Sequence, residues 1–146
     1  AVITNTGNLP LDSVFFQGSD FEAVVYTGEI VPAEKLTLLQ NSRRRVFQLP
    51  AENSIEWMLD HMRNSLGIEY LLLEGGANIN GQFLSANLVD EYFLTIGPKI
   101  VNNTTPLTPF SLNDEQLSEK LTNLELLSIA ANKKTDEIFL RYKIKH

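Results

Sequence analysis

A carboxylate and two glycines stand between an apolar run and a predicted helix. The apolar run is residues 70–73, and Glu74, Gly75 and Gly76 follow it. Because glycine has no Cβ, another surface can approach the backbone closely at such a turn. The helix N-terminus behind the glycines offers free N–H groups and a partial positive charge, which suit a phosphate group. Two interpretations stay open for this turn, a ligand cradle and a tight strand-to-helix connection with an acidic residue beside it.

Few other residues suggest chemistry. The sequence has no cysteine and two histidines without a close cluster of His, Asp and Glu, so we expect no metal site. Arg43, Arg44 and Arg45 are candidates for an anion site, although a solvated strand entrance is the favoured interpretation in an acidic chain. His61 lies off the apolar stripe of its predicted helix, so we expect it to face solvent.

Composition places the chain among ordinary globular proteins. It has 146 residues, 43% hydrophobic and 21% charged, which predicts one domain. A net charge of −6 argues against a general nucleic-acid binder. No apolar run approaches the roughly 20 residues that a membrane span needs. No signal peptide is recognisable, so we expect a cytoplasmic protein.

Apolar periodicity predicts an α/β fold. Residues 53–66 form the clearest helix, with five apolar side chains at helical spacing, a capping box at Asn53 and Glu56, and Gly67 at its end. Strands alternate with helices through two thirds of the chain, and two strands follow each other at the end, which is typical of a mostly parallel sheet with a C-terminal antiparallel hairpin. We expect strands near Val2, Val24, Phe47, Leu72, Leu94, Leu126 and Leu140, helices near residues 33–40, 54–66 and 77–86, a short helix within 112–121, and a hairpin turn at 133–136.

The glycine turn and its surroundings resemble a known family, the reductase domain of riboflavin biosynthesis, which has the dihydrofolate reductase-like three-layer fold. The resemblance covers nearly the whole chain, and its most specific segments are Leu72-Leu73-Glu74-Gly75-Gly76, Phe83-Leu84, Leu88-Val89-Asp90-Glu91 and Leu94-Thr95-Ile96-Gly97-Pro98-Lys99. It implies NADPH-dependent reduction of the ribosyl group of a 5-amino-6-(phosphoribosylamino)uracil-type pyrimidine. It also implies a homodimer, and a Gly-Gly peptide bond that can be cis.

The resemblance assigns roles to particular residues. Glu74 matches the carboxylate that contacts the pyrimidine substrate. Thr4, Asn5 and, more weakly, Thr27 match the strand ends on the adenosine side of the cofactor. The remaining matches form the loop and helix start that hold the NADPH phosphates, and they are Gly75, Gly76, Ala77, Asn78, Ile79, Asn80, Gly81 and Gln82.

The sequence departs from the family in three ways that matter, one of which is that Asn102-Asn103 replace a glycine pair usual after Pro98. Family members have an N-terminal part with a Ser-Leu-Asp-Gly-type substrate segment and an active-site aspartate, and neither is present, so we expect residues 1–146 to be a single reductase domain without its N-terminal portion. No catalytic residue is therefore predicted. Many relatives have an arginine at Asn5, which would pair with the 2′-phosphate of NADPH. Two functions stay open, the reductase and a nucleotide-binding or assembly module without catalytic activity.

Overall fold

The structure is a computed structural model that describes residues 1–102, 108–111 and 121–146. These residues form two compact units, Ala1–Leu71 and Leu72–His146. Each unit contains one three-stranded sheet. The expectation of a single domain stays a prediction, and the helix predicted within residues 112–121 lies almost entirely outside the described residues.

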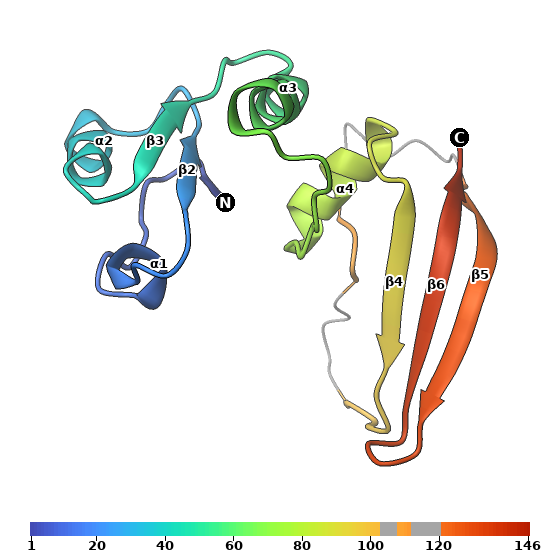
Figure 1. Cartoon of the computed structure of the whole chain (residues 1–146). Coiled ribbons are helices and arrows are strands. Elements are labelled where there is room, and N and C mark those ends of the chain that lie inside the picture. The colour runs from blue at the N-terminus through green and yellow to red at the C-terminus, as the bar shows by residue number, and fades with distance from the viewer. Residues whose placement is uncertain (103–107, 112–120) are drawn as a thin grey trace. The chain divides into compact units, whose positions relative to one another are not determined.

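The first unit is built on a parallel sheet of short strands, β1 (Val2–Thr4), β2 (Val24–Thr27) and β3 (Arg45–Gln48), in the order β1-β2-β3 (Figure 1). All four residues of β2 are buried, as expected for a strand with neighbours on both sides. Helices α1 (Val14–Gln17) and α2 (Ala33–Gln40) lie in the two connections that parallel pairing requires. Phe16, Val25 and Leu39 form the centre of the core.

Helix α3 (Ser54–Leu66) follows β3 and has the predicted bounds. Met58 and Met62 of its apolar stripe are buried, and Gly67 ends it with a φ of 68°, in the left-handed region that favours glycine. The predicted capping box is wrong, because Asn53 has a φ of 53° and its side chain makes no cap hydrogen bond. A capping residue normally has an extended backbone, whereas the backbone of Asn53 is left-handed.

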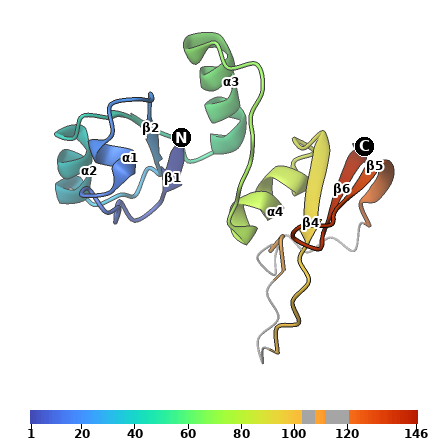
Figure 2. The same ribbon diagram turned by 60° about the horizontal axis from the view of Figure 1, so that its bottom comes forward.

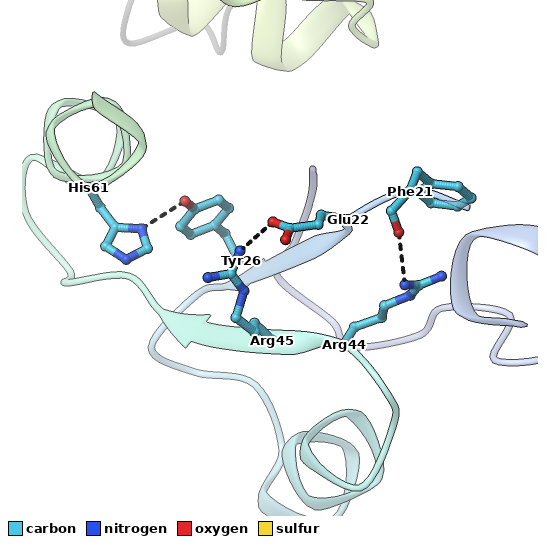
Figure 3. A network of polar contacts seen from close by, with 6 residues as sticks. All are labelled: Phe21, Glu22, Tyr26, Arg44, Arg45 and His61. Carbon is cyan, nitrogen blue, oxygen red and sulfur yellow. Dashed lines mark hydrogen bonds and ion pairs between the residues drawn. The ribbon is translucent and has the colours of Figure 1, made fainter. Parts of the chain in front are cut away.

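His61 lies on the flank of α3 and contacts the sheet, so the prediction that it faces solvent is wrong. It is half-buried, and its Nδ1 lies 2.9 Å from the hydroxyl of the buried Tyr26 (Figure 3). Its ring stacks on Trp57 at 5.3 Å between centroids and lies 4.3 Å from the ring of Phe47. Burial raises the pKa of the Tyr26 hydroxyl, which Arg45 opposes, so the phenol stays protonated beside His61. The helix therefore buries a wider stripe than its aliphatic positions indicate.

Arg44 holds parts of the first unit together, whereas Arg43 and Arg45 are exposed, as the solvated interpretation predicts. The Arg44 guanidinium donates to the backbone carbonyls of Phe15 at 2.7 Å and of Gly18. It also donates to Phe21 O at 3.4 Å (Figure 3) and lies 5.0 Å from the Phe21 ring centroid. Arg45 pairs with Glu22 at 3.0 Å. Because its donors are directed at carbonyl oxygens, Arg44 fits neither the anion-site nor the solvated interpretation.

The second unit combines one helix with an antiparallel sheet. Helix α4 (Ala77–Ser85) precedes β4 (Glu91–Ile96), and β6 (Glu137–Lys145) lies between β4 and β5 (Asn123–Asn132) in both views (Figures 1 and 2). The turn at residues 133–136 joins β5 to β6, which confirms the predicted hairpin. A β-bulge lies between Leu126 and Ser128 of β5.

One face of this second sheet carries no charged residue. Side chains opposite one another in the register share a face, and this uncharged face, called the apolar face below, is formed by Tyr92, Leu94, Ile96, Leu124, Leu126, Ile129, Ala131, Ile138, Leu140, Tyr142 and Ile144. Ile144 is buried, but Ile129 is 64% exposed and Leu126 53% exposed. The opposite face carries charges, including Arg141 bonded twice to Glu91 at 2.7 and 2.8 Å, which lowers the pKa of the Glu91 carboxyl.

Residues 70–73 do not form the predicted strand. No strand that the structure describes pairs with this segment, and Tyr70 is 92% exposed. An apolar run becomes a strand only when neighbouring backbones satisfy its N–H and C=O groups, which the composition of the run does not specify. The segment is not helical either.

Replacing Arg44 with lysine should destabilise the first unit. A lysine has a point-like ammonium in place of a planar fork and cannot reach three separate carbonyls, so we expect the free energy of unfolding to fall by about 1–3 kcal/mol. Urea unfolding measures this change. Arg43→Lys, at an exposed neighbour, is the control and should stay within about 0.5 kcal/mol of the parent. Equal effects of the two substitutions would contradict the role assigned to Arg44.

Candidate functional site

The carboxyl ends of β1 and β2 bring Thr4, Asn5 and Thr27 together. Thr4 and Thr27 lie opposite each other in the parallel register. The N–H of Gly28 donates to Thr4 O at 3.1 Å, and the N–H of Leu49 donates to Thr27 O at 2.8 Å, so the hydrogen-bond pattern continues past the strands. Ligands bind at this edge of open α/β sheets.

The three side chains at this edge differ in what they can offer a ligand. Thr4 is buried, and its Oγ1 accepts from the N–H of Gly7 at 3.0 Å. Thr27 is fully buried, and its Oγ1 has no partner among the described residues. Asn5 is exposed, and its Oδ1 would lie 2.7 Å from a Cβ at Gly28. Asn5 is therefore the member of this group whose side chain is accessible to a ligand.

The glycine turn lies at the start of α4. The peptide bond between Gly75 and Gly76 is cis, which confirms the possibility that the resemblance raised. Gly75 has a φ of 93°, in the region that disfavours other residues, whereas Gly76 has an ordinary φ of −73°. Glu74 is exposed directly before the turn.

The two glycines differ in the space around them. A Cβ at Gly75 would lie 2.8 Å from Nδ2 of Asn80, but a Cβ at Gly76 would meet nothing within 4 Å. The conformation and packing of the chain therefore require glycine at position 75 and do not require it at 76. Open space beside a backbone that any residue could adopt is what a closely approaching ligand would need.

The first turn of α4 supplies donors next to this open space. The first N–H groups of a helix have no intrahelical partner, and the first turn contains no acidic residue. The N–H of Asn80 already donates to Gly76 O at 3.0 Å. Such an end can hold a phosphate group of a cofactor.

The later residues of the predicted loop are directed to the protein itself. Gly81 is buried, and Gln82 donates through Nε2 to Asn78 Oδ1 at 2.6 Å. Asn80 donates through Nδ2 to Pro109 O at 2.9 Å. Gly76, Ala77 and Asn78 are thus the members of the loop best placed to meet a ligand, and Ile79 is half-buried.

A contact between α4 and the segment Thr108, Pro109, Phe110 and Ser111 was absent from the sequence-based prediction. The N–H of Ser111 donates to Ala77 O at 2.9 Å, and the Phe110 ring lies 5.3 Å from that of Tyr92. No periodicity connects positions about 30 residues apart, so the sequence carries no local signal of this contact.

The described part of the chain lacks the features of a metal site and of a membrane-spanning helix. Within residues 1–102, 108–111 and 121–146, no three His, Cys, Asp or Glu side chains are grouped so as to hold a metal ion. Among the same residues, none of the helices combines the length and apolar character of a membrane span.

Comparison with known proteins decides the family. The family described as the RibD C-terminal domain matches residues 1–134. The chain belongs to this family. Two curated relatives of this chain are named 2,5-diamino-6-ribosylamino-4(3H)-pyrimidinone 5′-phosphate reductase. The protein from Aquifex aeolicus is 31% identical over 98 residues, which is 66% of this chain and 43% of the relative. The protein from Methanothermobacter thermautotrophicus is 32% identical over 78 residues, 53% of this chain and 36% of the relative.

Similar solved structures confirm the fold class. A pyrimidine reductase-like protein from Corynebacterium diphtheriae superposes with a TM-score of 0.82 at 22% identity, covering 99% of this chain and 60% of that one. RibD from Acinetobacter baumannii gives 0.71 at 18% identity, over 98% of this chain and 36% of that one. The chain thus has the α/β, dihydrofolate reductase-like fold predicted from its sequence, and it spans 60% and 36% of these two proteins.

The two glycines should respond differently to a methyl group. Gly75→Ala forces a left-handed conformation on alanine and presses its Cβ against Asn80, so we expect a loss of about 1–2 kcal/mol of unfolding free energy from the backbone alone. Gly76→Ala should leave stability within about 0.5 kcal/mol of the parent. Urea unfolding of both variants gives the comparison, and a larger loss for Gly76→Ala would contradict this assignment.

Proposed function

We propose that the protein carrying this chain reduces the ribosyl group of a 5-amino-6-(phosphoribosylamino)uracil-type pyrimidine, with NADPH as the hydride donor. The observation that carries the proposal is membership of the RibD C-terminal domain family over residues 1–134. Both curated relatives are named as reductases of a ribosylamino-pyrimidinone phosphate. The geometry of the strand ends and the glycine turn supports it.

The residues of the glycine turn fit a dinucleotide. The open side of Gly76 admits a close approach. The first turn of α4 would offer its free N–H groups to a phosphate placed there. When bound, NADPH supplies a hydride to the ribosyl carbon. Gly76, Ala77 and Asn78 would hold its phosphates, and Gly75 would shape the turn that presents them.

The strand ends of the first unit match the positions that contact the adenosine side of NADPH in the family that the sequence resembles. Asn5 is exposed and can hydrogen-bond a ribose or its 2′-phosphate, but it carries no charge. The preference for NADPH over NADH should therefore be smaller than in relatives with an arginine at this position, since charge-assisted bonds are about twice as strong as neutral ones. Thr4 and Thr27 would support this edge from inside the protein.

Glu74 is the proposed substrate contact in this chain. Its carboxylate is exposed directly before the cofactor turn, where it can accept hydrogen bonds from the amino or hydroxyl groups of a ribosylamino-pyrimidine. A substrate held there would lie next to the cofactor.

The test is a titration with NADPH followed by NADPH oxidation in the presence of the pyrimidine. Gly76→Val should raise the dissociation constant for NADPH about ten- to a hundredfold, the equivalent of a hydrogen bond to a charged group at about 1.5–3 kcal/mol. Gly97→Val is a matched control, because a Cβ at Gly97 also meets nothing within 4 Å. Equal NADPH affinity in the Gly76→Val variant and the parent would contradict the cradle. NADPH binding without oxidation would favour a nucleotide-binding module.

The apolar face of the second sheet supports a homodimer as well. Side chains such as Ile129, Leu126 and Ile96 are about half or more exposed, although they lie side by side on one face. Contiguous apolar patches of this kind usually mark an interface. A second copy is a suitable partner, because the face has no charge to desolvate and can therefore pair with itself.

Ile129→Glu should abolish the dimer by burying a charge in this interface. Light scattering at micromolar concentration should then report a monomer. Ser128→Glu places the same charge on the neighbouring residue, which faces the opposite side of the sheet beside Arg141, and should leave the dimer intact. A monomeric parent protein would contradict the proposal.

A further inference from the structure

The side-chain amide of Asn80 connects two segments that are far apart in the sequence. Its Nδ2 donates to Pro109 O at 2.9 Å. The same amide packs against Gly75, since a Cβ there would lie 2.8 Å from Nδ2 and 3.2 Å from Oδ1. Through its backbone N–H, Asn80 also bonds Gly76 O at 3.0 Å. One residue thus contacts both glycines of the turn and the segment containing Pro109.

The segment of Thr108, Pro109, Phe110 and Ser111 is held to α4 at a second point. The N–H of Ser111 donates to Ala77 O at 2.9 Å. Phe110 packs on Tyr92 of β4 with its ring 5.3 Å away. The segment is therefore fixed both to the helix that begins at the turn and to the sheet of the same unit.

The geometry points to Asn80 as a positioning residue, which holds the Gly75–Gly76 turn in its ligand-binding form by tying it to residues 108–111. The inference rests on the proposed function for the identity of the ligand. The resemblance placed Asn80 among the groups that contact the cofactor. The bond that its side-chain NH2 group makes among the described residues, however, is to Pro109 O, and its Oδ1 is buried without a partner among the same residues.

The role requires an amide. Nδ2 must donate to a carbonyl, which an aspartate cannot do in its ionised form although it has the same shape. A buried Oδ1 without a hydrogen bond destabilises the fold. A side chain that keeps such an atom therefore needs other contacts that compensate for it. Asn80 has these contacts, with Gly75, with Gly76 and with Pro109.

The experiment compares the parent with Asn80→Ala, Asn80→Asp, Ser111→Pro and the Asn80→Ala/Ser111→Pro double variant. Ser111→Pro removes the N–H that donates to Ala77 O and leaves the atoms of the turn unchanged. Asn64→Ala is the control, because it removes an exposed amide whose bond is to Asp60 on α3. The dissociation constant for NADPH and amide hydrogen exchange without ligand are measured for each.

If Asn80 acts through residues 108–111, Asn80→Ala and Ser111→Pro should each weaken NADPH binding about three- to tenfold, as the loss of one neutral hydrogen bond implies. The double variant should bind NADPH about as tightly as the single variant with the larger loss, because both substitutions break the same connection. Asn80→Asp should resemble Asn80→Ala. Exchange should accelerate at residues 75–76 and at 108–111 together, and Asn64→Ala should change neither.

Additive losses in the double variant would show that Asn80 contacts the nucleotide directly and would overturn the inference. An Asn80→Asp variant with the affinity of the parent would overturn it too, because shape alone would then suffice. If the parent binds no NADPH, the proposed function fails, and the exchange measurement still decides on Asn80. Faster exchange in only one of the two segments would then overturn the inference.

Discussion

The parallel hydrogen-bond ladder of the first unit determines where its candidate site residues lie. Once Val2 is opposite Val25, Thr4 must be opposite Thr27, because a ladder allows no independent shift of single residues. The bonds from Gly28 to Thr4 and from Leu49 to Thr27 extend this constraint past the strands. Asn5, one residue beyond β1, is thereby held at the carboxyl edge of the sheet. The ladder in turn depends on β2, whose complete burial needs α1 and α2 in its two connections.

Local periodicity predicted the elements of this chain better than their contacts. Helices α2 and α3 have the predicted bounds, because their apolar positions and terminal residues are local signals. The run at residues 70–73 was misread, since an apolar run is also compatible with a segment that no strand pairs. His61 was misread because aliphatic spacing describes the centre of a helix contact but not its aromatic flanks. Partners distant in sequence, here Tyr26 and Phe47, decided its environment.

The candidate site was predictable as a set of positions but not as a set of roles. The sequence shows two adjacent glycines, and only their φ angles and surroundings separate one that the backbone requires from one that leaves open space. Thr4 and Thr27 were predicted as contacts, and their burial leaves Asn5 as the accessible side chain of the three. The contact of α4 with residues 108–111 joins segments that share no repeat or spacing, so no sequence pattern could report it.

The β-bulge between Leu126 and Ser128 determines which residues of β5 point to each face of the sheet. Leu124 and Leu126 occupy even positions, whereas Ile129 and Ala131 occupy odd ones, and yet all four belong to the apolar face. The extra residue moves the alternation by one step, so that both halves of the strand keep the same side toward the same surface. In a regular strand of this sequence, Ile129 and Ala131 would lie on the opposite face, which carries Arg141 and Glu137. The extra residue in β5 therefore joins two short apolar runs into one continuous apolar stripe. Deleting or adding a residue there would break the stripe.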